Sequence, residues 1–493
     1  MTASVSVTAE RRLAQPALAK PTLAPRPVVA SRSALGDWLL GRLRVAATHR
    51  GPTMLAVPAP RVAPEALLEL APAELETEAV TTLWDPVDGP AMSGVGAVRR
   101  VELRGSSRLA DFRIESERLF EELAVERHPE VDVFEARLYG GLAFDVGAEI
   151  APPWTELGDG SFVLPRLMYR CDGDTGALAL VVEPAALRDG AARRRQADLV
   201  LDVLDRLRDM PATTRPLEPL GEAHLAAPDV EEWQARVGAI RRAIAEGSID
   251  KIVAARRVEV NLSRPLRPTE VLRRLNRGLR ASTRFAFGRR DTAFVGVTPE
   301  RLISKRGRNV WTEALAGSIA SGDGGDTLVH ADELLHSGKD RHEQQLVVDS
   351  IVRRLEPWCD RLQVEERRVR ELRDVLHLHT PIRGRLRADR HVLDLVGALH
   401  PTPAVGGVPT DAALRWIRER EPHHRGWYAG PIGWIDGRGD GELWVGLRSA
   451  VLDGARAWLW VGAGIVSDSD PQAELRETEL KQEALLGALG GAG

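Results

Sequence analysis

The stretch "TRFAFGRRDTAFVGVTPERLISKRGRNVWTEALAGSIA", residues 283–320, decides the fold class of this chain. Short runs rich in β-branched and aromatic residues alternate with polar breaks at 289–291 and 307–309. Breaks of this kind are typical of turns that reverse the chain between neighbouring strands. The stretch therefore predicts an antiparallel meander.

Segments on either side of the meander extend the same pattern. Strands are expected at 137–146, 161–171, 250–260 and 442–464, and helices at 111–126, 229–247 and 340–355. Strands in runs, interrupted by helices, predict an α+β fold built on antiparallel sheets rather than a doubly wound parallel sheet. The sequence contains no GxGxxG or GxxxxGK[ST] motif, which argues against a dinucleotide or P-loop site.

The bulk composition is that of an ordinary globular protein, with 43% hydrophobic and 28% charged residues among 493. A net charge of −4 and a pI near 6.4 argue against a nucleic-acid or membrane-surface partner. No apolar run approaches the roughly 18 residues of a membrane span. With Cys171 and Cys359 as its two cysteines, the chain has no disulfide framework, and we expect a cytoplasmic protein.

The chain divides by composition into three parts. Residues 1–34 are rich in Ala, Pro and Arg, and we interpret them as a disordered tail rather than an organellar transit peptide. Residues 35–228, which end in a Pro-rich linker at 211–228, form the N-terminal part of a single domain. Residues 229–490 carry the chemical signals.

The last helix of this region raises a question. In "WLWVGAGIVSDSDPQAELRETELKQEALLGAL", residues 458–489, a strand breaks at two glycines and a helix begins near Asp470 and Pro471. One apolar stripe of the helix consists of Ala473, Leu480, Ala484 and Ala488. Glu477 stands in the middle of the stripe, and Glu474 and Lys481 stand on its margin. A buried carboxylate must be paired, protonated or bound to metal, and two interpretations remain: an ion pair or a metal ligand.

Three further side chains have both an ordinary and a chemical interpretation. Glu343 lies one turn into its helix and is either a half-exposed first-turn residue or a Mg²⁺ ligand. Lys251 opens a strand and either reaches solvent or, if desolvated, serves as a general base. Glu300 follows a proline and is either a surface turn residue or an acid presented at a strand end.

The glycines of "GAGIV" at 462–466 allow either a plain tight turn or close approach of backbone N–H groups to an anion. Arg448 and Lys481 make a carboxylate-binding corner plausible there. The histidines do not follow a zinc-ligand pattern and are interpreted mostly as loop or core residues. They stand at 377, 379, 400, 423 and 424.

Taken together, eight segments resemble the chorismate-utilising enzymes, the family of isochorismate, salicylate, anthranilate and aminodeoxychorismate synthases. They come in the family's order and span roughly residues 230–485. The segments are "DKIVAARR", "FVGVTPERL", "TEALAGSIA", "SGKDRHEQQLVV", "LHLHTPIRGRL", "LHPTPAVGGVP", "RGWYAGPIGW" and "VGAGIVSDSDPQAELRETELK".

The resemblance implies two packed antiparallel sheets flanked by helices, with the active site between them, chorismate as substrate and Mg²⁺ as cofactor. It assigns Glu343 and Glu477 to the metal, where the ion would hold the ring carboxylate of chorismate. It assigns the substrate contacts to Gly317, Ser318, His377, Tyr428, Arg448, Gly462, Ala463, Gly464 and Lys481.

Lys251 distinguishes the members of the family. The chain is similar to isochorismate and salicylate synthases, in which this lysine activates water for attack at C2 and a glutamate, here Glu300, protonates the leaving C4 hydroxyl. Aminodeoxychorismate synthases place a nucleophilic lysine where this chain has Ala316, and no glutamine amidotransferase segment or subunit is expected.

The resemblance therefore favours an isochorismate synthase. A salicylate synthase, which goes on to eliminate pyruvate, and a non-catalytic chorismate-binding homologue are the alternatives. Ser318 gives a soft preference for simple isochorismate synthesis. The roles of His379 and Glu474 stay open, as does the choice between menaquinone and siderophore biosynthesis.

Overall fold

A computed structural model describes residues 31–70, 79–146, 150–210, 217–225, 230–275, 282–322, 326–372 and 375–491. Most of the expected N-terminal tail and parts of the expected linker, 211–216 and 226–229, lie outside the described residues. The first helix begins at Arg32, where the hydroxyl of Ser31 caps it by accepting a hydrogen bond from the Ala34 N–H.

The strands form one branched, hydrogen-bonded network. Its root consists of β4 (Ala124–Arg127), β1 (Thr53–Ala59), β7 (Thr175–Val182) and the long strand β6 (Gly160–Asp172). Two arms leave β6, because β3 pairs along most of its length and β5 pairs with its N-terminal end. Among the described strands every pair is antiparallel except the parallel pair of β1 and β4.

We call the branch that begins with β3 the first arm. In order of pairing it contains β3 (Ala91–Glu102), β2 (Val80–Asp85), β10 (Thr283–Arg289), β11 (Thr292–Thr298), β20 (Ser449–Asp453), β21 (Arg456–Ile465) and β9 (Lys251–Asn261). The short strands β8 (His224–Leu225) and β17 (Gly407–Val408) pair with β9.

The second arm begins with β5. It contains β5 (Arg137–Leu142), β18 (Pro431–Asp436), β19 (Gly441–Val445), β12 (Arg301–Arg306), β13 (Asn309–Ala320) and β16 (Val375–Leu386), and β14 (Cys359–Val364) and β15 (Arg368–Leu372) both pair with β16. The two arms are the two packed antiparallel sheets that the family resemblance implies, and they are joined through β6.

The expected meander is correct in its hairpins and wrong in its middle. The strand pairs β10–β11 and β12–β13 form hairpins at the predicted turns, where Arg290 and Gly307 adopt positive φ. However, β11 pairs with β20 and β12 pairs with β19. The chain therefore passes from the first arm to the second at Pro299 and Glu300, and we call this link the crossover.

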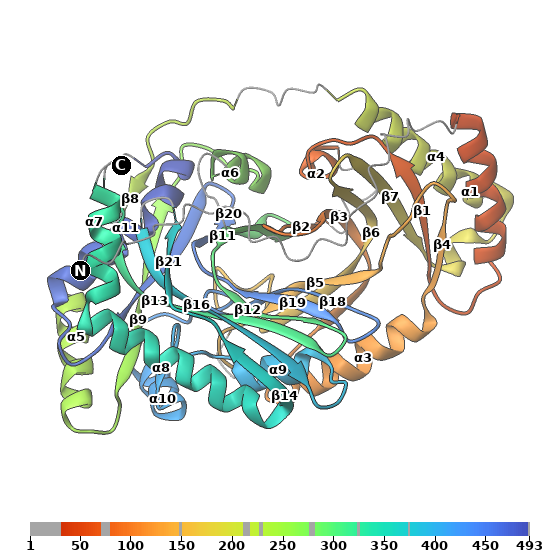
Figure 1. The fold of residues 1–493 in the computed structure, drawn as a ribbon. Helices are drawn as coiled ribbons and strands as arrows, with labels where there is room; N and C mark the ends of the chain where they lie inside the picture. Colours follow the sequence, from red (N-terminus) through yellow and green to blue (C-terminus); the bar gives the residue numbers. More distant parts are fainter. Residues whose placement is uncertain are drawn as a thin grey trace.

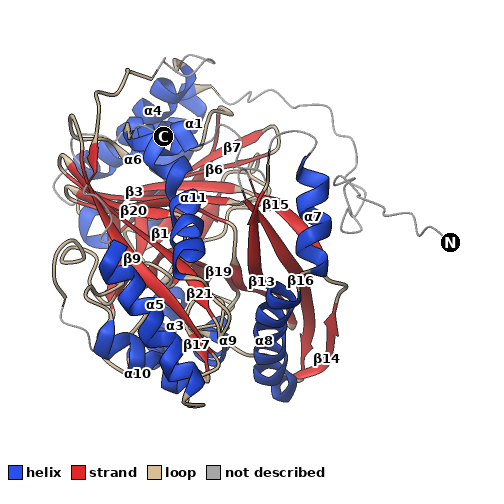
Figure 2. Cartoon of the chain, turned by 90° about the vertical axis from the view of Figure 1, so that its left-hand side faces the viewer, coloured by secondary structure: helices blue, strands red, loops and turns tan. Residues whose placement is uncertain are grey.

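Eleven α-helices of the described ranges pack around the two arms and the root. They are α1 (Arg32–Ala46), α2 (Ala66–Glu69), α3 (Arg108–Glu122), α4 (Gly190–Arg208), α5 (Val230–Ala245), α6 (Pro268–Leu275), α7 (Asp326–His336), α8 (Gly338–Leu355), α9 (Val392–Leu399), α10 (Thr410–Arg420) and α11 (Pro471–Leu489). Figure 1 shows α1 and α4 side by side over the root, and Figure 2 shows α7 and α8 along β13 and β16. The predicted helix at 111–126 ends earlier than expected, because 124–127 form β4.

Helix α11 lies between the outer ends of the two arms (Figure 2). It contacts β21 of the first arm, β13 of the second arm, and α5 and α6. Asp470 caps its N-terminus and Pro471 is its first residue, as the sequence predicts. Among the helices of the described ranges, none is long and apolar enough to cross a membrane.

Strands from the two halves of the chain share the arms. In the first arm β2 pairs with β10, and in the second arm β5 pairs with β18. A single large hydrophobic core accordingly contains residues from both sides of residue 228, such as Trp84, Phe162, Phe285 and Trp434.

Candidate active site

A cavity opens between the two arms and is bordered by α8 and α11. Both arms contribute to its wall: β9 and β21 from the first, β13 and β16 from the second, and the crossover between them. The polar residues that line it are Glu300, Ser318, Glu343, His377, Arg425, Tyr428, Arg448, Glu477, Lys481 and Gln482.

The crossover presents Glu300 to this cavity. The side chain is buried, with 4% of the residue exposed. Burial, followed by the nearby anion Glu313, raises the pKa of Glu300 to about 8, although Lys251 and Lys481 act in the opposite direction. At neutral pH the Glu300 carboxyl is therefore protonated and can donate a proton.

Lys251 and Glu343 form an ion pair at the cavity wall: Glu343 lines the cavity, and the buried Lys251 lies behind it. Lys251 opens β9, and its Nζ lies 2.9 Å from the Glu343 Oε1 on the first turns of α8, with the lysine side chain fully buried. The solvent-reaching lysine and the half-exposed glutamate are therefore both wrong as interpretations.

Glu477 reaches the same cavity from α11. Its carboxylate is paired with Lys481 one turn later and accepts a hydrogen bond of 2.9 Å from the Ser318 hydroxyl on β13. Burial would raise the pKa of Glu477, but the Lys481 ammonium and these hydrogen bonds hold it below its ordinary value. Lys481 also donates to the Gly462 carbonyl at 3.2 Å, which ties α11 to β21.

The expected apolar stripe of α11 is correct only in part. Ala488 is buried and Leu480 and Ala484 are half-buried, but Ala473 is exposed. The buried face also contains Leu475, Thr478, Leu485, Leu486 and Leu489. The carboxylate in this face is Glu474, which is 2% exposed and is bonded to Lys339 and Ser469 at 2.9 and 2.7 Å. Glu477 lies at the edge of the face, where the helix borders the cavity.

The two glycines near the end of β21 allow close approach across the cavity wall. A Cβ at Gly464 would lie 2.5 Å from the Glu343 Oε1 and 3.0 Å from the Lys251 Cε. A Cβ at Gly462 would lie 3.2 Å from the Tyr428 hydroxyl. Each glycine therefore leaves room for a polar group of the cavity.

One expectation about this segment is corrected. The strand does not break at the glycines, because β21 runs through them to Ile465 in continuous pairing with β9, and a tight turn is excluded. Ala463 is buried and is not in the cavity wall of the described residues, whereas Gly462 and Gly464 are. Alternation along the strand points successive residues to opposite faces.

Opposite β21, a bulge in β13 shapes the wall at Gly317. The register with β16 shifts between Ala316 and Ser318, and Gly317 adopts a φ of 75°, a conformation that favours glycine. A Cβ there would lie 2.9 Å from the Asp340 side chain. The bulge brings Ser318 opposite His377 in the register and toward Glu477.

The remaining expected contacts surround the same space. Burial and the cations Arg448 and Lys481 place the pKa of His377 well below its ordinary value, so the ring is neutral. The Arg448 guanidinium donates to the Lys481 carbonyl at 2.5 Å, and Arg448 itself has a φ of 48°. Tyr428 stacks near Trp460, with ring centroids 6.4 Å apart. The cavity thus combines cations with a neutral acid, which suits an anionic substrate.

The side chains present fit one Mg²⁺ ion. Within the described residues no three His, Cys, Asp or Glu side chains converge as a ready metal cluster. Glu343 and Glu477 nevertheless line one cavity, and burial together with Glu343 raises the pKa of Asp340, with Glu477 adding to the effect. Mg²⁺ prefers few protein carboxylates and keeps several waters, which matches two glutamates in an open cavity.

Sequence reasoning missed several residues around the cavity. Gln482 and Trp460 line it, Thr402 lies beside the Glu300 carboxyl, and Glu313 and Arg370 contact the crossover. These residues have no distinctive spacing, because they come from separate segments that only the folded chain brings together. The local pattern "TPERL" carries no signal for them.

Comparison with known proteins identifies a family. A family model described as chorismate binding enzyme matches residues 46–490. The salicylate biosynthesis isochorismate synthase of Pseudomonas aeruginosa is 38% identical over 364 residues, which cover 72% of this chain and 75% of that protein. The isochorismate synthase MenF of Bacillus subtilis is 34% identical over 362 residues, which cover 72% of this chain and 74% of the relative.

A solved structure has the same fold. The structure of MenF, the menaquinone-specific isochorismate synthase of Escherichia coli, superimposes with a TM-score of 0.71 at 26% identity. The match covers 92% of this chain and all of the other. It therefore includes the N-terminal half, for which the sequence motifs give little guidance.

Proposed function

Because the chain belongs to the chorismate-binding enzyme family, we propose that it is a Mg²⁺-dependent isochorismate synthase that converts chorismate to isochorismate. The observation that carries the proposal is one cavity lined by a neutral carboxyl, Glu300, and two metal-type carboxylates, Glu343 and Glu477, with the buried Lys251 paired to Glu343. The similar proteins of Pseudomonas aeruginosa and Bacillus subtilis are named isochorismate synthases, which agrees with this activity.

The proposed reaction moves a hydroxyl from C4 to C2 of the ring by exchange with water. Lys251, as the neutral amine, takes a proton from a water molecule whose oxygen bonds to C2. The ring double bonds shift, the C4–O bond breaks, and Glu300 gives its proton to the departing hydroxyl, which leaves as water. One water enters and one leaves, so the product is an isomer of the substrate.

Glu300 suits the acid role because it is protonated at neutral pH. Its pKa of about 8 lies close to the working range, where a general acid is most effective. Arg448 and Lys481 border the cavity and would orient the carboxylates of chorismate. His377, neutral and buried, would contribute hydrogen bonding without adding charge.

Glu343 and Glu477 would hold the metal, one from α8 and one from α11. When bound, Mg²⁺ supplies positive charge that neutralises the ring carboxylate of the substrate and fixes the ring. Both glutamates are paired with lysines of the site, Lys251 and Lys481. We infer that binding of the metal is coupled to the positions of these two cations.

A product assay tests the proposal. Purified protein is incubated with chorismate and Mg²⁺, and the products are identified by mass spectrometry. Isochorismate supports it, salicylate with pyruvate assigns the chain to the salicylate synthases, and unchanged chorismate indicates a non-catalytic binding protein. Lys251→Ala should lose isochorismate formation by at least about a hundredfold, and retention of wild-type turnover would exclude Lys251 as the base.

A further inference from the structure

The crossover that carries Glu300 is fixed at three consecutive backbone positions. The Pro299 carbonyl accepts a hydrogen bond of 3.3 Å from Arg370, and the Glu300 carbonyl accepts one of 2.9 Å from the Val445 N–H. The Arg301 N–H donates to the Glu313 Oε1 at 2.9 Å. The backbone on both sides of the Glu300 side chain is therefore held in place.

Two of these holding groups form one ion pair. The Arg370 guanidinium on β15 donates at 2.9 Å to the Glu313 Oε2 on β13, while its other nitrogen reaches Pro299. Arg370 and Glu313 therefore grip the crossover from either side of Glu300. Both side chains are largely buried, with 18% and 8% of their surfaces exposed.

His379 on β16 completes the cluster. Its Nε2 lies 2.9 Å from the same Glu313 Oε2, and the Arg368 Nε lies 3.4 Å from its Nδ1. Arg368 can only donate, so the ring accepts at Nδ1 and donates from Nε2 to the carboxylate. Burial lowers the pKa of His379 in spite of Glu313, so the donor is a neutral imidazole.

The cluster also sets the charge next to Glu300. Burial alone would raise the pKa of Glu313, but Arg370 and His379 hold it below its ordinary value, so Glu313 is an anion. The charged groups that act on Glu300 are Glu313 from β13, Lys251 from β9 and Lys481 from α11. The two lysines favour the ionised form of Glu300, whereas the anion Glu313 favours its protonated form.

We propose that Glu313, Arg370 and His379 form a positioning unit for the proposed acid Glu300: they clamp the crossover and place a fixed anion behind the carboxyl, which keeps the proton on Glu300. The inference rests on the proposed isochorismate synthase activity. None of the three is assigned contact with the reacting atoms, so they act through Glu300 and are not catalytic residues themselves.

The test compares the pH dependence of kcat/KM for the wild type and Glu313→Gln, assayed with chorismate and Mg²⁺. The basic limb of this profile is the fall in kcat/KM at high pH, where Glu300 loses its proton. Loss of the Glu313 anion should move the basic limb to lower pH by about one unit. At pH values above the limb kcat/KM should then fall about tenfold, whereas at pH 6 it should change little. Because Glu313 does not touch substrate, the loss should appear in kcat rather than in KM.

Glu442→Gln is the matched control. Glu442 on β19 is, like Glu313, a buried carboxylate that contacts Arg301. Its Oε1 lies 3.3 Å from the Arg301 Nε. Replacement of Glu442 should lower the midpoint of thermal unfolding and leave the basic limb of the kcat/KM profile at its wild-type pH. If Glu313→Gln does the same, the positioning role is overturned and Glu313 is merely structural.

A pair of variants at His379 covers the case in which Glu313→Gln does not fold. His379→Gln retains a donor toward Glu313 and should keep the wild-type limb, whereas His379→Leu removes the donor and should shift the limb in the same direction as Glu313→Gln. Equal limbs in the two variants would contradict the proposal. If the wild type forms no isochorismate, both the proposed function and the positioning role are overturned. If the wild type is active and the variants leave the pH profile unchanged, only the positioning role is overturned.

Discussion

At the residue scale, Glu300 is a carboxyl that its surroundings prevent from ionising. It sits where the chain changes arms, with Glu313 behind it and the cavity in front. An unfolded chain would expose the same carboxyl to water, where it ionises near pH 4.5. The folded protein therefore binds one more proton than the unfolded chain at neutral pH, and that difference reduces stability.

We predict that Glu300→Gln is inactive but more stable than the wild type. Below about pH 4.5 Glu300 is protonated in both the folded and the unfolded wild type, so it does not reduce stability. As the pH rises from 4.5 toward 8, Glu300 ionises only in the unfolded chain, and the loss of folding stability grows. Glutamine does not titrate, so the gain in folding stability of Glu300→Gln over the wild type should grow across this pH range to roughly 1–3 kcal/mol. Thermal melts at pH 5 and pH 8 measure it; an equal margin at both would contradict this assignment of the proton.

The sequence identifies single residues unevenly. Lys251, Glu300, Glu343 and Glu477 are identified by motif. The structure places the three glutamates in the wall of one cavity and Lys251 behind that wall, paired with Glu343. Periodicity alone misjudges α11, because alanines occur on both its faces and Ala473 is exposed. The cluster behind Glu300 could not be predicted, since it depends on strand pairings that place residues 313, 370 and 379 side by side.

At the element scale, β21 approaches α8 closely enough that one methyl group matters. A Cβ at Gly464 would meet the Glu343 carboxylate and the Lys251 side chain at 2.5 and 3.0 Å. We predict that Gly464→Ala displaces this pair and lowers kcat/KM at least about tenfold, because misplacement of a reacting group by a fraction of an ångström is costly.

Gly487→Ala is the comparison for Gly464→Ala. Gly487 lies in α11, and a Cβ there meets nothing within 4 Å. Alanine should keep activity and stabilise the helix by up to about 1 kcal/mol. Steady-state kinetics and urea melts distinguish the two variants; wild-type kcat/KM in Gly464→Ala would mean that the close approach is not needed.

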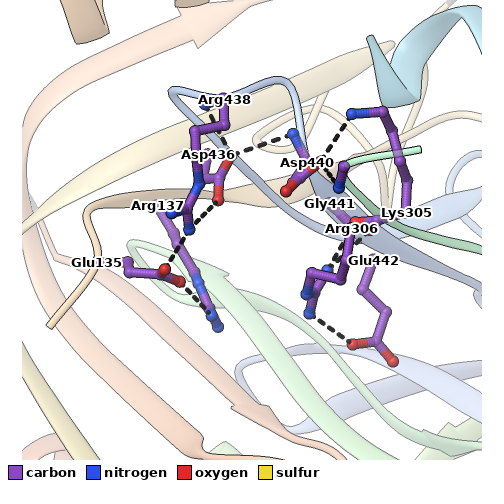
Figure 3. A network of polar contacts seen from close by, with 10 residues as sticks. Glu135, Arg137, Lys305, Arg306, Asp436, Arg438, Asp440, Gly441 and Glu442 are labelled. Atoms are coloured by element: carbon purple, nitrogen blue, oxygen red, sulfur yellow. Dashed lines mark hydrogen bonds and ion pairs between the residues drawn. The ribbon is translucent and has the colours of Figure 1, made fainter. Parts of the chain in front are cut away.

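The second arm is braced by a polar network at the far ends of β12, β18 and β19 (Figure 3). Lys305 is fully buried, and its Nζ lies 2.7 Å from Asp440 and 3.2 Å from Asp389. The Gly307 N–H also donates to Asp440 at 2.8 Å. The turn from β18 to β19 is therefore tied to the hairpin of β12 and β13.

We predict that Lys305→Met destabilises the protein by about 3 kcal/mol, because it leaves Asp440 buried without its cation. The cavity wall is built by other residues, so kcat/KM should stay within about twofold of the wild type. Arg118→Met, which removes the exposed ion pair with Glu122, should change stability little. Denaturant melts measure both; a neutral Lys305→Met would show that the network is not a brace.

Hairpins were predictable and the crossover was not, for a physical reason. Both turns carry local signals: Gly307 tolerates a positive φ, and the turn at 289–291 is a polar break between two apolar runs. The separation of β11 from β12 depends on β20 and β19, which lie about 150 residues later in the chain. No window of sequence around Glu300 contains that information.

At the scale of the whole molecule, Glu343 of α8 and Glu477 of α11 would hold the proposed metal, which would link the two helices. Ligand binding to the folded state alone stabilises a protein by about 2.7 kcal/mol at a hundredfold excess over Kd. We predict that Mg²⁺ raises the thermal midpoint by a few degrees, and that Glu343→Gln and Glu477→Gln lose this shift. Glu479→Gln, which alters an exposed residue of α11, should retain it; an undiminished shift in the first two variants would place the ion elsewhere.

The central claim is that water is the nucleophile in the cavity between the arms. The most direct test is turnover of chorismate with Mg²⁺ in H₂¹⁸O, stopped early and analysed by mass spectrometry. Water addition at C2 predicts isochorismate that carries one solvent oxygen at C2 and is therefore about two mass units heavier. Unlabelled isochorismate would contradict the claim, because the C4 hydroxyl would then have migrated without exchange with water.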